Sequence, residues 1–277
     1  MKVVVNKEVI YEKFSELKQK SKYCLTNFYP NDEKLDYWIE KNIFYLNSFA
    51  NSVFFFRKDR DFFHLYFCSI NLLSLQDDLK FINEQYSEIL VADCIGPDSY
   101  LSPLVEVFET CGFKKYILYH RMKRFIQANE LLLEVSQDVT FPTLNDAPII
   151  SAMFESNFDR YAEQLPTIEE LEMANNNKEV ILIRDHFKIA GVLIRKTAPK
   201  SSLWMFFLVN KECRNQKNGS KLLSYFFNEC RNKRIIMWVL DNNINAIEIY
   251  KHYGFTFDSL DDQIMTNKDI NYETTNN

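Results

Sequence analysis

The sequence predicts an α/β chain built from two domains of one fold. Apolar runs of strand length alternate with segments whose apolar residues follow helical spacing. The element order of the second half is repeated in the first, and in each half a helix ends at a Gly-Phe pair, Gly112–Phe113 and Gly254–Phe255. A repeat of about half the chain length indicates an internal duplication, and 277 residues are enough for two domains of ordinary size.

Capping residues and turns define the elements of the second half. Thr143 and Thr167 stand at helix starts, His186–Phe187 forms a hairpin turn, and Gly254 ends a helix. The expected elements are strand 131–141, helix 143–158, a helix from Thr167, strands 180–185, 189–196 and 203–209, helix 221–233, strand 235–240, helix 245–253 and a final strand through 255–260 that extends toward 267.

The first half follows the same order. Its expected elements are strands 53–58 and 62–70 around a turn at Asp59–Asp61, helix 73–86, strand 88–95, helix 99–111 and strand 114–125. Residues 21–52 are rich in aromatic side chains. These fit either a hydrophobic core or the lining of an acceptor cleft, and the core is favoured.

Composition excludes several classes of function. The net charge is −5 and the basic residues are scattered, which argues against a nucleic-acid ligand. No apolar run is long enough to cross a membrane, and Glu8 and Glu12 come too early for a signal peptide, so we expect a cytoplasmic protein. The six cysteines and four histidines show no metal-ligand spacing, which predicts free thiols and no metal site.

A loop rich in polar residues follows the apolar strand Leu203–Val209. It contains Arg214, Lys217 and Gly219 and leads into a helix. Free backbone N–H groups at a helix start bind anions such as pyrophosphate, and Arg214, Lys217 and Lys221 add positive charge. Because only 5 glycines occur in the chain, Gly219 is expected to have a backbone role. Taken alone, the loop also fits an ordinary strand–helix connection, which is then the favoured alternative.

Two motifs resemble those of the GNAT N-acetyltransferase superfamily. The first is the loop Arg214–Ser220, in which Lys217 replaces the first glycine of the family pattern. If that position has a positive φ, the side chain costs on the order of 1 kcal/mol. The second is VLDNNINAIEIYKHYGF (239–255), where Asn243, Ala246, Tyr250 and Gly254–Phe255 match the family's offsets. The resemblance covers residues 130–270.

The resemblance implies two tandem GNAT-like domains, each a mixed, mostly antiparallel sheet flanked by helices. The expected division is a degenerate copy at 1–126 and an acetyltransferase domain at 127–277. It further implies acetyl-CoA as co-substrate, bound in a V-shaped opening between the strands that end at Val209 and Leu240. The residues expected to bind it are Leu208, Val209, Arg214, Asn215, Gln216, Lys217, Asn218, Gly219, Ser220, Asn243 and Ala246.

The family mechanism is direct attack of an amine on the thioester. Tyr250 stands where many relatives carry the general acid that protonates the departing thiolate; a packed helix aromatic is the alternative. The strand Leu203–Val209 carries no acid, which leaves Glu155, Asp159 and Glu163 as candidates for the base; charged residues that simply face solvent are the alternative. Cys213 and Cys230 have no adjacent His and are expected to pack in the core.

The first copy lacks these motifs. Asp77 and Asp78 stand near the helix start where a pyrophosphate would bind, and Ser102 and Phe108 replace the second signature. That half is expected to shape the acceptor cleft or stabilise the catalytic half.

The prediction for the whole protein is an N-acyltransferase that acts on a small-molecule or peptide amine, without nucleic-acid or membrane partners. A homodimer is left open, and the alternative function is a catalytically silent module that binds a CoA ester or another protein.

Overall fold

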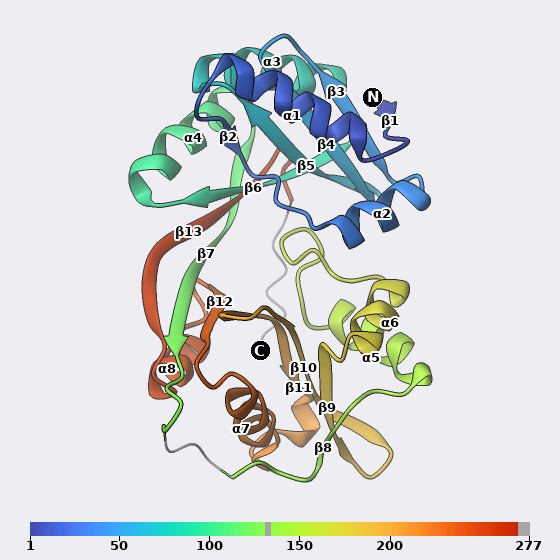
Figure 1. Cartoon of the computed structure of the whole chain (residues 1–277), viewed down its shortest axis with the longest axis vertical. Helices are drawn as coiled ribbons and strands as arrows, with labels where there is room; N and C mark the ends of the chain where they lie inside the picture. The colour runs from blue at the N-terminus through green and yellow to red at the C-terminus, as the bar shows by residue number, and fades with distance from the viewer. Residues whose placement is uncertain (131–133, 271–277) are drawn as a thin grey trace. The chain divides into compact units, whose positions relative to one another are not determined.

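The computed structural model describes residues 1–130 and 134–270 and divides into two compact units (Figure 1). The N-terminal unit consists of Met1–Tyr119 and the segment that begins at Ser259. The C-terminal unit is His120–Asp258. These units differ from the ranges expected from the sequence, 1–126 and 127–277, chiefly because the last strand joins the N-terminal unit.

The N-terminal unit has a mixed sheet with helices on both faces. Its strand order is β1-β3-β4-β5-β6-β13, with β2 paired to β5. The elements are β1 (Lys2–Val3), α1 (Glu8–Lys20), β2 (Leu25–Thr26), α2 (Asp32–Glu40), β3 (Phe44–Ser48), β4 (Ser52–Asp59), β5 (Phe62–Ser69), α3 (Leu72–Gln85), β6 (Ile89–Gly96), α4 (Asp98–Thr110) and β7 (Lys114–Phe125).

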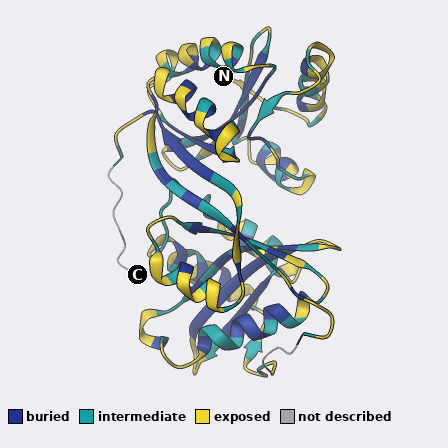
Figure 2. Ribbon diagram, turned by 90° about the vertical axis from the view of Figure 1, so that its left-hand side faces the viewer, coloured by how far each residue is buried: buried dark blue, intermediate teal, exposed yellow. Residues whose placement is uncertain are grey.

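The alternation of side chains along β4 creates two cores in this unit, because successive residues of a strand point to opposite faces. Phe54 and Phe56 pack with α3 and α4. Phe55 faces the other side, where it stacks on Phe14 of α1 and Phe28 at centroid distances of 6.0 and 4.6 Å. Figure 2 shows the buried strands between helices whose outer faces are exposed.

The C-terminal unit repeats this architecture with strand order β7-β12-β11-β10-β9-β8. Its elements are β8 (Val139–Thr140), the 3-10 helix η1 (Leu144–Asp146), α5 (Ala147–Glu155), α6 (Ile168–Asn176), β9 (Val180–Asp185), β10 (Lys188–Thr197), β11 (Ser201–Val209), the 3-10 helix η2 (Lys211–Cys213), α7 (Asn218–Glu229), β12 (Arg234–Leu240), α8 (Ile244–His252) and β13 (Thr256–Thr266).

The C-terminal unit also has a core on each face of its sheet. Trp204 of β11 packs with α7 and α8, and Phe206 packs with α5 and α6. The aromatic pair Phe154–Phe206 is stacked at 4.9 Å between centroids. The order helix, helix, antiparallel strands, helix, strand, helix therefore occurs twice, as the internal repeat predicts.

The two glycine stops have the same conformation. Gly112 has φ 88° after α4, and Gly254 has φ 81° after α8. A side chain is strained in this left-handed region, which explains why glycine ends both helices. Phe113 and Phe255, which follow, are both buried. The two Gly-Phe pairs from which we infer the duplication are therefore the same kind of helix ending, present once in each unit.

Strands β7 and β13 each begin in one unit and end in the other. β13 pairs antiparallel with β6 from Asp261↔Gly96 to Thr266↔Val91. Each unit therefore contains a strand segment whose sequence position belongs to the other half. A linear boundary cannot describe such an exchange, which is why the predicted ranges place residues 259–270 differently.

Several sequence-based boundaries were wrong. The strand expected at 131–141 is reduced to Val139–Thr140, while residues 131–133 lie outside the described chain. The helix expected at 221–233 begins at Asn218, so the glycine loop forms its first turn. The aromatic segment 21–52, for which no elements were predicted, contains α2 and part of the core, including buried Phe28, Trp38 and Phe44.

Candidate active site

β11 and β12 form a parallel pair that opens along its length. Only three residue pairs are in register, from Ser201↔Arg234 to Leu203↔Ile236. Both strands then continue to their ends without further pairing to each other among the described residues. Because unpaired strand edges present free N–H and C=O groups, the opening can accept an extended polar ligand. This geometry agrees with the V-shaped opening that the resemblance implies.

A β-bulge lies where β11 leaves β12. On its other side β11 pairs with β10, and the register shifts between Ile194↔Phe206 and Arg195↔Trp204, which leaves Met205 as the extra residue. A bulge bends its strand and redirects the backbone groups around it. This bulge could not be predicted from the sequence, because the apolar run Leu203–Val209 is unbroken.

The start of α7 has no side-chain cap. Its N-cap residue is Lys217, whose side chain makes no capping hydrogen bond. The preceding loop is held by other contacts: the Asn218 amide donates to the Cys213 carbonyl at 3.1 Å, and Arg214 Nε donates to the Val209 carbonyl at 3.3 Å. The first N–H groups of α7 are thus available to an anion next to the end of β11.

Gly219 allows α7 to approach β11 closely. A Cβ at this position would lie 3.3 Å from Phe207 Cζ and 3.4 Å from Val209 Cγ2. Gly219 lies in the first turn of α7, and its φ is not positive. The expected backbone role is therefore a close approach of helix to strand and does not involve a special φ.

Positive φ occurs instead at the residue that replaces the family glycine. Lys217 has φ 63° and ψ 10°, and Asn215 has φ 62°. Lys217 therefore has the positive φ at which a side chain is expected to be strained. Its side chain is exposed, whereas Lys221 pairs with Asp138 at 2.5 Å. Of the three cations expected near a phosphate, Lys217 is therefore the exposed one, while Arg214 also donates to the Val209 carbonyl.

The Lys217→Gly variant is expected to be more stable than the wild type. Glycine has no Cβ and so removes the strain of a side chain on a left-handed backbone. We expect the free energy of unfolding to rise by up to about 1 kcal/mol. Urea unfolding without ligand measures this change. Lys217→Ala is the matched control, because alanine keeps the strain; an equal gain in that variant would show that φ is not the cause.

Tyr250 lies on α8 against the aromatic side chains of the C-terminal unit. Its ring is edge-on to Trp204 at 5.3 Å and to Phe255 at 6.2 Å. Burial raises the pKa of Tyr250 to about 12, and the negative charge of Glu163 contributes to the increase. No hydrogen-bond partner of its hydroxyl is seen in residues 1–130 and 134–270. The phenol therefore stays protonated at neutral pH and retains a proton to donate.

Asn243 and Ala246 form the cap of α8. Asn243 is the N-cap, and its side-chain oxygen accepts a hydrogen bond from the Ala246 N–H at 3.1 Å. This contact fixes the start of the helix that carries Tyr250. The structure thus gives both residues a local role, and their expected contact with a cofactor stays a prediction.

The three candidate bases have different surroundings. Asp159 Oδ1 accepts hydrogen bonds from the N–H groups of Tyr161 and Ala162, both at 2.9 Å, and so stabilises the connection between α5 and α6. Glu155 is exposed at the end of α5. Glu163 is the one whose charge acts on Tyr250. The identity of the base stays a prediction, with Glu163 as the candidate whose charge affects the pKa of Tyr250.

The cysteines of this unit are structural. Cys213 and Cys230 are buried free thiols. Burial raises the pKa of Cys230 to about 11, which keeps it in the unreactive thiol form. The expectation that both pack in the core is confirmed.

In the described residues no group of three or more His, Cys, Asp or Glu is arranged to hold a metal, and no helix is long and apolar enough to span a membrane.

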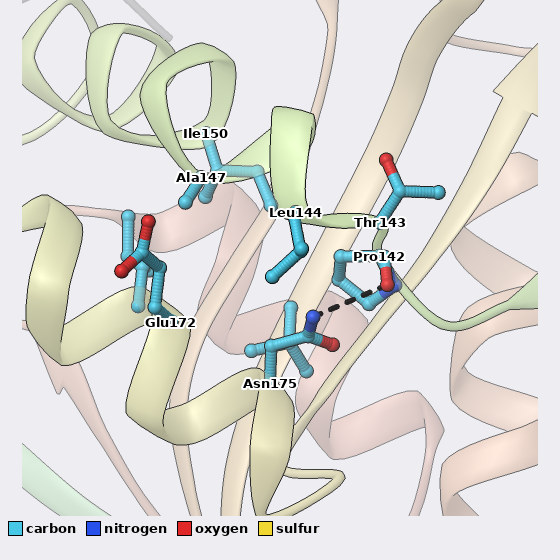
Figure 3. A pocket seen from close by; sticks show the side chains of 9 residues that line it. Pro142, Thr143, Leu144, Ala147, Ile150, Glu172 and Asn175 are labelled. Carbon is cyan, nitrogen blue, oxygen red and sulfur yellow. Dashed lines mark hydrogen bonds between the residues drawn. The ribbon is translucent and has the colours of Figure 1, made fainter.

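A small apolar hollow lies between η1, α5 and α6 of the same unit (Figure 3). Its lining includes Leu144, Ile150 and Leu171, and Asn175 closes one side by donating to the Pro142 carbonyl at 3.2 Å. Glu172 is the acidic residue in its lining. The hollow includes neither Tyr250 nor the α7 loop, so we do not assign it to the candidate site.

The open strand pair, the α7 loop and α8 fall within a single family match. Residues 176–257 match the family model of the acetyltransferase (GNAT) domain. This part of the chain is therefore similar to a GNAT acetyltransferase domain. The matched range runs from the end of α6 to the start of β13 and includes Tyr250 and the α7 loop. No curated protein sequence matches the chain.

Solved GNAT structures resemble the whole chain in fold. A GNAT-family acetyltransferase from Colwellia psychrerythraea is 14% identical, with TM-score 0.55 over 96% of this chain and 98% of that one. A GCN5-related N-acetyltransferase from Sphaerobacter thermophilus is 13% identical, with TM-score 0.57 over 96% and 94%. A tandem GNAT protein from the clavulanic acid biosynthesis pathway is 11% identical, with TM-score 0.56 over 83% and 85%. The fold prediction of two tandem GNAT-like domains is confirmed.

Proposed function

We propose that this protein is an N-acyltransferase that transfers acetyl from acetyl-CoA to a primary amine by direct attack. The observation that carries the proposal is the uncapped start of α7 beside the open end of β11. Acetyl-CoA joins a pyrophosphate to an extended chain with two amide groups. A helix start binds the first of these groups and an unpaired strand edge binds the second.

The same elements supply the groups that would hold the co-substrate. Backbone amides of Arg214–Ser220 would bind the pyrophosphate, with the Arg214 and Lys217 side chains adding charge. The edge of β11 near Leu208 and Val209 would hydrogen-bond the pantetheine amides. This assignment follows from the position of the loop directly after β11 and needs no metal ion.

Transfer then requires two proton movements. The neutral amine attacks the thioester carbonyl carbon, a C–N bond forms and the C–S bond breaks. Tyr250 donates its proton to the departing sulfur, and the amine proton passes to Glu163 directly or through water. The amine belongs to a small molecule or a peptide. Holding amine and thioester together supplies much of the acceleration.

Binding is tested by the thermal midpoint of the full chain with and without millimolar acetyl-CoA. A ligand at 100 times its Kd adds about 2.7 kcal/mol to the stability of the native state, which is seen as a rise in midpoint. Release of CoA thiol over a panel of amines then tests turnover. Binding without turnover on any amine would favour the silent CoA-binding module, and no rise in midpoint would refute the proposal.

A further inference from the structure

The N-terminal unit contains a second parallel strand pair that opens in the same way. β5 and β6 are in register only from Phe62↔Ile89 to His64↔Val91. This is the same number of pairs as in β11 and β12, and in both cases the two strands are joined by one helix. The duplication has therefore reproduced the opening that we assign to acetyl-CoA in the other unit.

This second opening is filled by the chain itself. β2 pairs antiparallel with the far end of β5, Leu25 with Ser69 and Thr26 with Cys68. The Thr26 hydroxyl also donates to the Phe67 carbonyl at 2.6 Å. The connection between α1 and α2 thus supplies a strand to the edge of β5 that β6 has left.

Asn27 bridges the two diverging strands through its side-chain amide. Its Nδ2 donates to the carbonyl of Leu65 on β5 at 3.1 Å and to that of Asp93 on β6 at 3.0 Å. Its Oδ1 accepts from the Phe67 N–H at 2.7 Å. Asn27 is 7% exposed, so the three hydrogen bonds are shielded from water. One carboxamide therefore satisfies strand groups that an amide-containing ligand would otherwise bind.

The helix that follows β5 is closed to anions as well. Asn71 is the N-cap of α3, and its side chain accepts from the Ser74 N–H at 2.8 Å. Asp78 in the second turn accepts from the Ser52 hydroxyl at 2.5 Å. By contrast, α7 has no side-chain cap, and the strand pairings of β11 are with β10 and β12 among the described strands.

We propose that residues 25–27 are a built-in substitute for the cofactor, which closes the opening of the N-terminal unit permanently. The Asn27 carboxamide takes the position of a pantetheine amide, and the unit is held in its folded form without a ligand. Of these two openings, only that of the C-terminal unit is consequently left for CoA. That last statement rests on the function proposed for the C-terminal unit, whereas the closure of the N-terminal opening does not.

Amide hydrogen exchange of the full chain, with and without acetyl-CoA, tests this proposal. The Phe67 N–H is expected to be protected in both conditions, and exchange in β5 and β6 is expected to be the same in both. Asn27→Ala should speed exchange of the Phe67 N–H by at least about tenfold, because its buried acceptor is lost. Asn47→Ala is the control in the same unit: Asn47 Nδ2 donates to Tyr86 Oη at 3.3 Å, away from Asn27's partners.

Rapid exchange of the Phe67 N–H in the wild type, or a change in β5 exchange on addition of acetyl-CoA, would overturn the proposal. If Asn27→Ala fails to fold, these two measurements on the wild type still decide whether the N-terminal opening is closed. Exchange in residues 214–221 separates this result from the proposed function. If exchange there does not change with acetyl-CoA, CoA binding by the C-terminal unit is refuted. The exchange rate of the Phe67 N–H still reports whether the N-terminal opening is closed.

Discussion

Tyr250→Phe is expected to lower kcat by about 100-fold or more, because general acid catalysis contributes that much or more to a rate. The variant keeps the ring and its edge-on contact with Trp204, and the hydroxyl has no hydrogen-bond partner among the described residues. Stability and acetyl-CoA affinity should therefore change little. Steady-state kinetics with the amine identified by the panel, together with the apo thermal midpoint, measure these quantities.

The pH dependence provides a second test of the same residue. Because burial and Glu163 raise the pKa of Tyr250 to about 12, the phenol keeps its proton throughout the neutral and mildly alkaline range. The wild-type rate should show no loss from ionisation of Tyr250 below about pH 11. Tyr225→Phe, which removes a hydroxyl from α7 outside the candidate site, is the control. Equal rates in wild type and Tyr250→Phe would exclude the tyrosine as the acid.

Gly219→Glu is expected to weaken acetyl-CoA binding by about 100-fold or more. The new carboxylate lies in the first turn of α7, where it repels phosphate, and its Cβ meets Phe207 at 3.3 Å. Isothermal titration with acetyl-CoA measures the affinity, and the midpoint without ligand measures the steric effect on the fold.

Gly219→Ala separates charge from size in that result. Alanine places the same Cβ against Phe207 and adds no charge. It should show the steric effect of the Cβ on stability while retaining most of the affinity. The difference in affinity between the two variants should shrink as salt is raised, because salt screens exposed charges. If both variants lose affinity equally, anion binding by the α7 start is not what decides affinity.

Local patterns in the sequence were sufficient for much of the fold. Gly112 and Gly254 each end a helix with positive φ, as expected from the residue that best tolerates that conformation. Thr167 caps α6 in a capping box with Glu170. The hairpin turn at His186–Phe187 also lies between β9 and β10. These features depend on neighbours within a few residues, so they can be predicted without knowledge of the tertiary structure.

Features that depend on distant residues could not be predicted in the same way. The missed helices α1 and α2 are a separate case, because the amphipathic pattern that predicts them is local to the first 40 residues. Gly219 was expected to have a backbone role, but the kind of role is set by Phe207 and Val209 on another element. Glu163 could not be separated from Glu155 and Asp159, because nothing local to these acids indicates which one acts on Tyr250.

The sequence by itself determined the duplication, the order of the elements shared by the two halves after residue 52, and the residues of the α7 loop and α8, because periodicity, caps and spacing are properties of neighbouring residues. Only the tertiary structure decided how the opening of the N-terminal unit is closed. β5–β6 and β11–β12 open alike, and their difference is that Asn27 reaches Leu65, Phe67 and Asp93 across long separations in sequence. Hydrogen bonds between such distant residues form only when the chain has folded, which is why the sequence showed no sign of the closure.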